Sequence, residues 1–367
     1  MTLAALVVLA LASPQQTGLY GADTTVPERT AVTIDGVTYG AEGNDRGPIG
    51  GGPGYADVVT AGDRTVRDLD SLTHALATAE PGEVVFVPGD VTIDLTAACL
   101  IDGLVLEIPA GVTLASDRGH GGSPGALLFS DHLATRPLIR VTGDAARVSG
   151  LRLRGPDPER RLDHHRRSFR GDHPPGRTRY YALPTSDGIR TRHDRLRIDN
   201  CELAGWSHAA IDLRGGDGHL VQHCFIHHNQ RQGLGYGICH DVAFSTIERN
   251  LFDWNRHSIA GTGRPGSGYV ARHNVERGTS LSHLFDMHGG RDRKDGTDVA
   301  GTRVRVERNT FLCERTAVVI RGVPEDRVDV LHNWAVHAGP AALVRAGERT
   351  IVGPNAFGLG SPRVILP

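Results

Sequence analysis

Short apolar runs recur between residues 196 and 344 with a period in the low twenties, and each ends in a polar turn. The residues that mark these turns are Asn200, His223, Asn250, Asn274, Asn309 and Asn333. After most of them, a few turn-forming residues lead to a second apolar run, such as 210–213 or 317–320. Repeated short strands without helical spacing predict a β-solenoid, because one coil cannot bury its apolar face alone. Stacked Asn amides can hydrogen-bond along the axis. We therefore expect an all-β chain that forms a single-stranded right-handed parallel β-helix.

The segment from 66 to 80 has a different pattern, because its apolar residues return every three or four positions. These residues are Leu69, Leu72, Ala75, Leu76 and Ala79. This spacing predicts a short helix that Asp68 or Asp70 could cap and that Pro81-Gly82 would end. Strand-like runs follow at 84–87 and 91–95. Such a helix would cover the open end of the solenoid, where strand edges would otherwise be exposed.

A short helix followed by Pro-Gly-Glu-Val-Val-Phe-Val-Pro-Gly (81–89) resembles the start of many β-helix enzymes. Residues 66–350 as a whole resemble the pectate-lyase-like superfamily, which includes alginate and chondroitin lyases, polygalacturonases and phage tailspikes. The resemblance implies a right-handed parallel β-helix with an N-terminal capping helix. It implies less about activity, because this fold carries lyases, hydrolases, epimerases and proteins that only bind.

We expect one β-helix domain over residues 63–360, preceded by an irregular Gly/Pro-rich lead-in at 14–62. Residues 1–13 form an apolar run that ends in small residues, as in a secretory signal, but no Lys or Arg precedes it. The run is too short to span a bilayer. Export to the periplasm or the extracellular space is favoured over a buried first strand or a misassigned start.

Two insertions interrupt the coils, at 156–183 and at 289–301, and both are expected as loops. The first is rich in Arg and His and ends near Tyr180 and Tyr181, although the whole chain has a formal charge of -2. Insertions of this length are usually functional or disordered. This one could hold an acidic polymer, or it could be an ordinary solvated loop.

Composition narrows the possible partners. The near-neutral charge gives no electrostatic case for nucleic acid or an anionic membrane. The 47 Gly and only 5% aromatic residues fit many tight turns, and a monomer is expected. Five cysteines cannot all pair within one chain. Cys201 and Cys224 should lie on adjacent coils, where stacked thiols are favoured over a disulfide.

Alternate strand residues face opposite sides of a sheet, so inward and outward columns can be read from the repeat. The expected inward column is Ile189, Ile211, Ile238, Ile259, Phe285 and Val318. Two outward columns follow, namely Arg190, Asp212, Cys239, Ala260, Asp286 and Val319, and Arg192, Arg214, Asp241, Thr262, His288 and Arg321. Five coils would present a polar strip about 20 Å long, which matches several sugar units. A soluble sheet also needs a polar outer face, whatever its function.

The density of His, Arg and Asp is highest between 256 and 293. The candidate catalytic residues there are Arg256, His257, His283, Asp286, His288 and Arg291. The histidines could serve in acid/base catalysis, bind a metal, or form a structural ladder. Candidate substrate-binding residues lie on neighbouring coils and in the first insertion. They are Arg190, Arg192, Asp212, Arg214, His240, Asp241, Arg264, Tyr180 and Tyr181.

Elimination at a uronic acid suits these residue types best. The reaction needs a group that neutralises the carboxylate, a base for the C5 proton and an acid for the leaving oxygen. Arg256, Arg264 and Arg291 are candidate carboxylate clamps, because a guanidinium binds a carboxylate through two hydrogen bonds. His257 or His283 would be the base, and a Tyr or a second His the acid. Asp286 could orient a His, or bind calcium together with Asp241.

The sequence therefore favours a lyase that acts on an acidic polysaccharide, with calcium as its only candidate cofactor. Glycoside hydrolysis is the second hypothesis, because Asp187-Gly188-Ile189 resembles a phrase of polygalacturonases. The paired Asp that those enzymes carry on the next coil is missing, and Ala209-Ala210 stands near that place. The third hypothesis is a non-catalytic carbohydrate-binding or structural solenoid.

Overall fold

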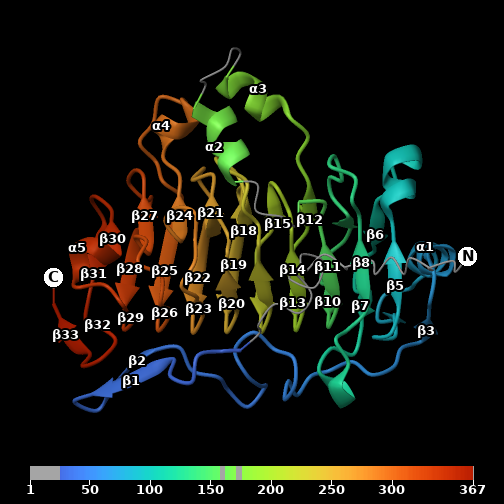
Figure 1. The fold of residues 1–367 in the computed structure, drawn as a ribbon, viewed down its shortest axis with the longest axis horizontal. Coiled ribbons are helices and arrows are strands. Elements are labelled where there is room, and N and C mark those ends of the chain that lie inside the picture. The colour runs from blue at the N-terminus through green and yellow to red at the C-terminus, as the bar shows by residue number, and fades with distance from the viewer. Residues whose placement is uncertain (1–24, 158–161, 171–175, 367) are drawn as a thin grey trace, which may run out of the picture.

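The computed structural model describes residues 25–157, 162–170 and 176–366. Within these residues the chain forms a right-handed parallel β-helix, and its strands build three long sheets (Figure 1). Each full coil contributes one strand to the first, second and third sheet in turn. The predicted fold class is confirmed. The signal-like segment 1–13 and the lead-in up to residue 24 lie outside the described residues.

The first sheet has eleven described strands, all parallel. They are Arg64–Thr65 (β3), Val84–Phe86 (β4), Thr113–Ala115 (β7), Arg147–Ser149 (β10), Arg197–Asp199 (β13), His219–Gln222 (β16), Phe244–Glu248 (β19), Gly268–Arg272 (β22), Arg303–Glu307 (β25), Arg327–Leu331 (β28) and Thr350–Val352 (β31).

The second sheet also has eleven described strands, and only the last runs antiparallel to its neighbour. They are Thr92–Asp94 (β5), Leu127–Phe129 (β8), Arg152–Arg154 (β11), Glu202–Ala204 (β14), Phe225–His227 (β17), Leu251–Asp253 (β20), Val275–Glu276 (β23), Thr310–Phe311 (β26), Trp334–Ala335 (β29), Asn355–Phe357 (β32) and Arg363–Ile365 (β33).

The third sheet has nine described strands and carries the polar strip predicted from the repeat. They are Leu106–Ile108 (β6), Ile139–Val141 (β9), Asp187–Thr191 (β12), Ala209–Leu213 (β15), Tyr236–His240 (β18), His257–Gly261 (β21), Phe285–Met287 (β24), Val318–Ile320 (β27) and Val344–Arg345 (β30). A separate hairpin joins Ala31–Ile34 (β1) to Val37–Gly40 (β2).

The N-terminal end of the solenoid is covered by helix α1, Leu69–Ala77 (Figure 1). Asp68 caps it, because its side chain accepts a hydrogen bond from the backbone N–H of Ser71. Leu72 and Leu76 are buried against the apolar core. The predicted capping helix is confirmed, with Asp68 as its N-cap. The remaining helical segments are Ala98–Asp102 (η1), His120–Gly122 (η2), Leu162–Arg170 (α2), Arg177–Ala182 (α3), Gly290–Arg293 (α4) and Pro340–Leu343 (α5).

An asparagine ladder runs along the turn between the first and second sheets. Its members, each bonded to the next through the side-chain amide, are Asn250, Asn274, Asn309, Asn333 and Asn355. The predicted stacking of asparagines is confirmed, but two of the six residues predicted to mark the turns lie one position away from the ladder. Asn200 and His223 align with Arg249, one position before the ladder, and have left-handed φ values of 55° and 50°. Cys201 and Cys224 take the ladder position in those coils, and both are buried free thiols.

Residues 38–57, which we call the strap, lie along this same turn. The strap bonds to successive coils: the backbone N–H of Gly40 donates to the His332 carbonyl, and the N–H of Gly50 donates to the Arg249 carbonyl, both at 2.9 Å. His223 Nδ1 donates to the Pro48 carbonyl at 2.7 Å. Figure 1 shows this part of the chain passing under the solenoid. The Gly/Pro-rich lead-in thus fastens coils that are far apart in the sequence.

The two insertions contain helices, although the sequence pattern predicted loops. Helices α2 and α3 lie in the first insertion and pack through Phe169, Tyr180 and Tyr181, whose rings meet edge to face. Arg231 anchors this pair, because its guanidinium lies 4.9 Å from the Tyr180 ring and donates to the Tyr180 carbonyl at 2.8 Å. Helix α4 lies in the second insertion. No helix in the described ranges is long and apolar enough to cross a membrane.

Candidate active site on the third sheet

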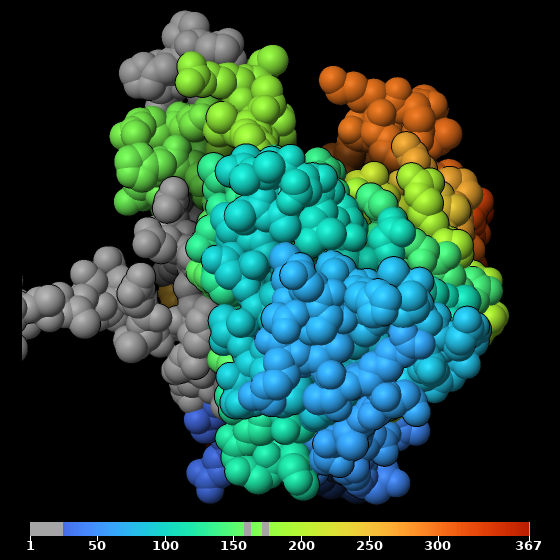
Figure 2. Space-filling model, turned by 90° about the vertical axis from the view of Figure 1, so that its right-hand side faces the viewer, coloured from blue at the N-terminus to red at the C-terminus, as the bar shows by residue number. Residues whose placement is uncertain are grey.

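The outer face of the third sheet lies between the two insertions. Figure 2, a view of the end that α1 covers, shows the α2–α3 insertion and the α4 insertion as two projections with a groove between them. Strand register confirms the first predicted outward column: Arg190, Asp212, Cys239 and Ala260 pair in sequence, and Asp286 pairs with Val319. The inward column, from Ile189 to Val318, is fully buried. Alternation along the strands therefore places charged side chains on the floor of this groove.

Asp286 is the centre of one polar cluster and is itself fully buried. Arg321 donates to both of its carboxylate oxygens, with Nε at 3.0 Å from Oδ1. His283 Nε2 lies 3.0 Å from Oδ1, and His288 Nε2 lies 3.0 Å from Oδ2. Although burial alone would raise it, the hydrogen bonds of His283, His288 and Arg321 hold the pKa of Asp286 well below its usual range. Asp286 is therefore a permanent carboxylate that orients its neighbours.

His257 connects this cluster to the next coil. Its Nδ1 donates to the His283 carbonyl, and its Nε2 lies 3.8 Å from Asp286 Oδ2. Burial, and secondarily Arg256, holds the pKa of His257 well below its usual range, so the ring is neutral. Burial also lowers the pKa of His283. His257 has no exposed surface, so it can support a reacting group but cannot contact a polymer in the groove without rearrangement.

A second cluster surrounds the buried carboxylate of Asp187 on β12, four coils before Asp286 on β24. His208 Nδ1 donates to Asp187 Oδ1, and Arg136 Nε donates to Oδ2 at 2.9 Å. Arg190 bridges Asp187 and Asp212, with Nε at 2.9 Å from Asp212 Oδ2. Although burial alone would raise it, the interactions with His208, followed by the charges of Arg190 and Arg136, lower the pKa of Asp187. In the tautomer whose Nδ1 proton bonds Asp187, His208 Nε2 carries the lone pair and can accept a proton.

Tyr236 lies between the two clusters. Its ring centroid is 5.7 Å from that of His208, edge to face, and 5.9 Å from that of His257, stacked. The Arg256 guanidinium carbon lies 5.8 Å from the same ring. Two nitrogens of Arg256, Nε and Nη1, are buried and have no hydrogen-bond partner among the described residues. Burial raises the pKa of Tyr236 to about 12, so its hydroxyl keeps its proton at neutral pH.

A pocket of about 470 Å³ adjoins this floor beneath α3. Arg136, His208 and Tyr181 line it together with apolar residues of the insertion. Tyr181 is exposed, whereas Tyr180 is almost fully buried between α2 and α3. Of the two tyrosines predicted to bind substrate, the structure therefore places Tyr181 beside the groove and Tyr180 in the packing of the insertion.

The other predicted residues divide between the groove and elsewhere. Asp212 holds Arg190 and Arg214, while Asp241 bonds Thr262 at 2.8 Å and Arg264 at 3.3 Å. Arg192 follows β12 and is exposed. Arg291 is largely exposed on α4, and its nearest ion pair is with Asp298 at 3.6 Å. The sequence predicted Arg291 as a clamp for the substrate carboxylate. The arginine that bonds Asp286 is Arg321, which was not among the residues predicted for the site.

His240 is not on the outer face, contrary to the prediction. Its side chain is fully buried, and its ring nitrogens bond Ser245 Oγ at 2.7 Å and the Ala260 carbonyl at 3.0 Å. Burial lowers its pKa to about 4. The reason is strand alternation, because His240 and the inward Ile238 are two residues apart and share one face.

The structure gives no calcium site from the predicted pair. Among the described residues, groups of possible metal ligands within 4.8 Å of one another are His257, His283 and Asp286, and Asp187, His208 and Asp212. Asp241 is in neither group. Calcium prefers six to eight oxygen ligands, whereas each group contains imidazole and is already neutralised by arginine. These residues do not fit calcium.

No protein-family model and no curated protein sequence matches this chain. Solved structures do match its fold. One is a family 28 exopolygalacturonase from Yersinia enterocolitica, at a TM-score of 0.52 and 11% identity over 82% of this chain and 70% of that one. Others are an alginate lyase from a Paenibacillus species, at 0.45 and 15% over 78% and 98%, and the A-module of a mannuronan C-5 epimerase from Azotobacter vinelandii, at 0.46 and 15% over 82% and 79%. At this identity the likeness shows the parallel β-helix fold.

Several residues of the site were missed from the sequence, and Tyr236 is the most instructive. Strict alternation would place it inward with Ile238, yet it packs with the outward residues Cys239 and Ala260. The strand changes its facing at Gly237, where a Cβ would lie 2.5 Å from the Ser258 carbonyl oxygen. A glycine inside a strand pattern signals such a close approach, so this signal was present in the sequence.

Proposed function

We propose that the groove on the third sheet binds an acidic polysaccharide and cleaves it by β-elimination next to a uronic acid. The observation that carries this proposal is the arrangement around Tyr236. His208 and Arg256 both lie against this tyrosine, one with a basic nitrogen and the other with unpartnered buried N–H groups. Buried donors without a partner are costly, and a substrate carboxylate would satisfy them.

Each step of the elimination then has a residue of this chain. Arg256 binds the uronate carboxylate and stabilises the negative charge that develops when C5 loses its proton. His208 Nε2 accepts that proton, while Asp187 holds the ring and stabilises the imidazolium that forms. The C5–H electrons form the C4–C5 double bond as the C4–O bond breaks. The Tyr236 hydroxyl gives its proton to the leaving oxygen, and proton exchange with water restores both residues.

The surroundings favour an anionic polymer. Arg136, Arg190, Arg214 and Arg321 line the same face, and each is partly exposed while bonding a buried carboxylate. The Asp286 cluster fixes His257, which stacks on the opposite side of the Tyr236 ring. In this proposal His257, His283 and His288 position the tyrosine, and His208 takes the role of base that the sequence suggested for His257 or His283.

Hydrolysis is less consistent with the charges. A general acid would need a protonated carboxyl group in the groove, but Asp187 and Asp286 both have lowered pKa values. Burial raises the pKa of Glu276 well above its usual range, but this residue is buried on the second sheet. None of these three carboxyl groups is therefore a protonated acid on the outer face of the third sheet.

The test is the ultraviolet absorbance of unsaturated products on a panel of uronic-acid polymers, with and without a chelator. We expect turnover on at least one polymer, and a loss of about 100-fold or more in kcat for His208→Ala, Tyr236→Phe and Arg256→Gln. Tyr181→Phe is the matched control, because this tyrosine lines the pocket but takes no part in the proposed reaction. It should change KM at most.

Other outcomes would contradict the proposal in distinguishable ways. New reducing ends without unsaturated product would show a hydrolase. Binding of a polymer without any new ends would show a carbohydrate-binding solenoid. Full activity of His208→Ala together with loss in His283→Ala would return the role of base to the Asp286 cluster.

A further inference from the structure

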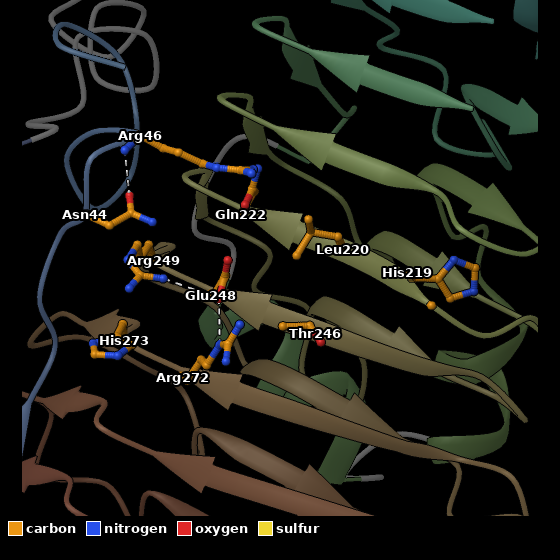
Figure 3. A pocket seen from close by; sticks show the side chains of 11 residues that line it. Asn44, Arg46, His219, Leu220, Gln222, Thr246, Glu248, Arg249, Arg272 and His273 are labelled. Carbon is orange, nitrogen blue, oxygen red and sulfur yellow. Dashed lines mark hydrogen bonds and ion pairs between the residues drawn. The ribbon is translucent and has the colours of Figure 1, made fainter. Parts of the chain in front are cut away.

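A second polar pocket lies between the strap and the outer face of the first sheet (Figure 3). Its volume is about 580 Å³. Its polar lining comes from the strap and from three successive coils. These residues are Asn44 and Arg46 of the strap, and His219, Gln222, Thr246, Glu248, Arg249, Arg272 and His273 of the coils. The pocket therefore forms only where the strap lies against the first sheet.

The pocket contains more positive than negative charge. Arg249 and Arg272 share one carboxylate, that of Glu248, with Nη1 at 3.3 Å and Nε at 2.6 Å from Oε2 (Figure 3). Arg46 adds a third guanidinium. Its carboxylate neighbour, Asp57, is 3.8 Å away and lies closer to Arg197, at 3.0 Å. Three guanidinium groups thus line a pocket in which Glu248 is the lining carboxylate.

The pKa shifts of two titratable groups reflect the same excess of positive charge. The pKa of Arg249 is lowered, first by burial and then by Arg272, despite the opposing effect of Glu248. The pKa of His273 falls to about 4, through burial and the charges of Arg249, Arg308 and Arg272. In addition, Arg249 Nε is buried and has no partner among the described residues. A buried donor on a guanidinium in a positive pocket is a place where an anion would be stabilised.

We propose that this pocket binds an oxyanion, held by the guanidinium groups of Arg249, Arg272 and Arg46. The planar forks of these side chains match the two oxygens of a carboxylate or sulfate group. Because Arg46 belongs to the strap and the other two to the coils, the anion would join the strap to the first sheet. The oxyanion could be a free inorganic anion or an acidic group on a sugar chain. The site is independent of the reaction proposed on the third sheet.

The test is isothermal titration calorimetry at constant ionic strength, since salt screens such contacts. One arm uses sodium sulfate, and the others use a uronic-acid trisaccharide and a neutral trisaccharide. The wild-type protein should bind sulfate or the acidic trisaccharide saturably, and the neutral one not at all. Arg249→Gln and Arg272→Gln should each weaken binding about tenfold or more. Glu248→Gln should strengthen it, because it removes the carboxylate that competes for both arginines.

Arg327→Gln is the matched control. Arg327 also lies on the first sheet and bonds a carboxylate through Nε, that of Asp329 at 3.1 Å, with nearly the same exposure as Arg272 but outside the pocket. It should bind as the wild type does. Circular dichroism verifies that each variant is folded, and Arg46→Gln on the strap replaces any variant that is not.

Three results would overturn the proposal: no saturable binding of either anion to the wild type, equal weakening in Arg327→Gln, or weaker binding in Glu248→Gln. Binding of sulfate alone would identify a free-anion site. Binding of the acidic trisaccharide that weakens in Arg249→Gln would identify a glycan site in this pocket, because the groove on the third sheet keeps its own residues in that variant. Turnover on the third sheet is measured in the same variants. It should be unchanged in all of them, so that a failure here remains separate from a failure of the elimination mechanism.

Discussion

Replacing Asp286 with Asn tests whether the buried carboxylate holds the site together. The native side chain accepts two hydrogen bonds from Arg321 and lies 3.0 Å from both His283 Nε2 and His288 Nε2. Asn keeps the shape but offers one acceptor oxygen and places an N–H₂ group against donors. The substitution therefore leaves a guanidinium without its counter-charge and at least one donor facing another donor.

The expected cost follows from the burial of the pair. Removing one partner of a buried ion pair destabilises a protein by about 3–5 kcal/mol. Arg321 keeps about a quarter of its side-chain surface exposed and can regain some hydration, so we expect about 3 kcal/mol. Asp329→Asn is the control, because Asp329 is also almost buried but has a single, half-exposed arginine partner. It should cost less than about 1 kcal/mol.

The assay is equilibrium denaturation in urea, followed by tryptophan fluorescence and circular dichroism. We expect the midpoint of Asp286→Asn to fall without a change in the m-value, because the same surface is exposed on unfolding. Since the pKa of Asp286 is lowered in the folded state, its stabilisation is complete above the unfolded pKa of about 4 and is lost as pH falls through the folded value. The difference between wild type and variant should therefore stay constant from about pH 5 to about pH 8 and shrink below about pH 4. Equal stability of Asp286→Asn and wild type at pH 7 would refute this account of the site.

Three further outcomes follow from particular contacts. Asn274→Ala removes four buried hydrogen bonds of the ladder and should lower the free energy of unfolding by about 3 kcal/mol, measured in urea. Burial lowers the pKa of His240 to about 4, so this residue is neutral in the folded protein at neutral pH. As pH falls, a proton binds the unfolded chain before the folded one. The free energy of unfolding should therefore fall between about pH 6.5 and about pH 4, by about 3 kcal/mol for this group. In His240→Gln one proton fewer should bind on unfolding, so the free energy of unfolding should depend less steeply on pH. An unchanged slope would contradict the assignment of His240 as a neutral buried residue. Gly237→Ala places a Cβ 2.5 Å from the Ser258 carbonyl oxygen, so it should displace Tyr236 and lower the free energy of unfolding by about 2 kcal/mol. Gly278→Ala is the control, because its Cβ meets no atom within 4 Å, and it should be nearly neutral in the same urea denaturation.

Much of the fold could be predicted from the sequence because a solenoid repeats one local rule. The spacing of apolar residues predicted the coils, and alternation placed Ile238 inward and Asp286 outward in agreement with the register. The capping helix followed from its apolar period and Asp68. The first two landmarks were misplaced by one residue, because Cys201 and Cys224 replace the ladder asparagine and the polar residue before each of them occupies a left-handed turn.

The candidate site was predicted less completely. The His, Arg and Asp residues of one segment were found, but their partners come from other coils. Arg321 reaches Asp286 from the following coil, and Asp187 and His208 also belong to successive coils. Tyr236 was hidden by the change of facing at Gly237, which simple alternation does not describe.

By itself, the sequence determined the repeat, the helix that closes one end and the columns of side chains, because these depend on residues close in the chain. The tertiary structure decided which charges meet. Coil stacking brings residues from different repeats to within about 5 Å of one another. The strap bonds to coils that are well over a hundred residues away from it in the sequence. Pairing, burial and the pKa values of Asp286 and Tyr236 depend on these long-range contacts, and local patterns cannot encode them.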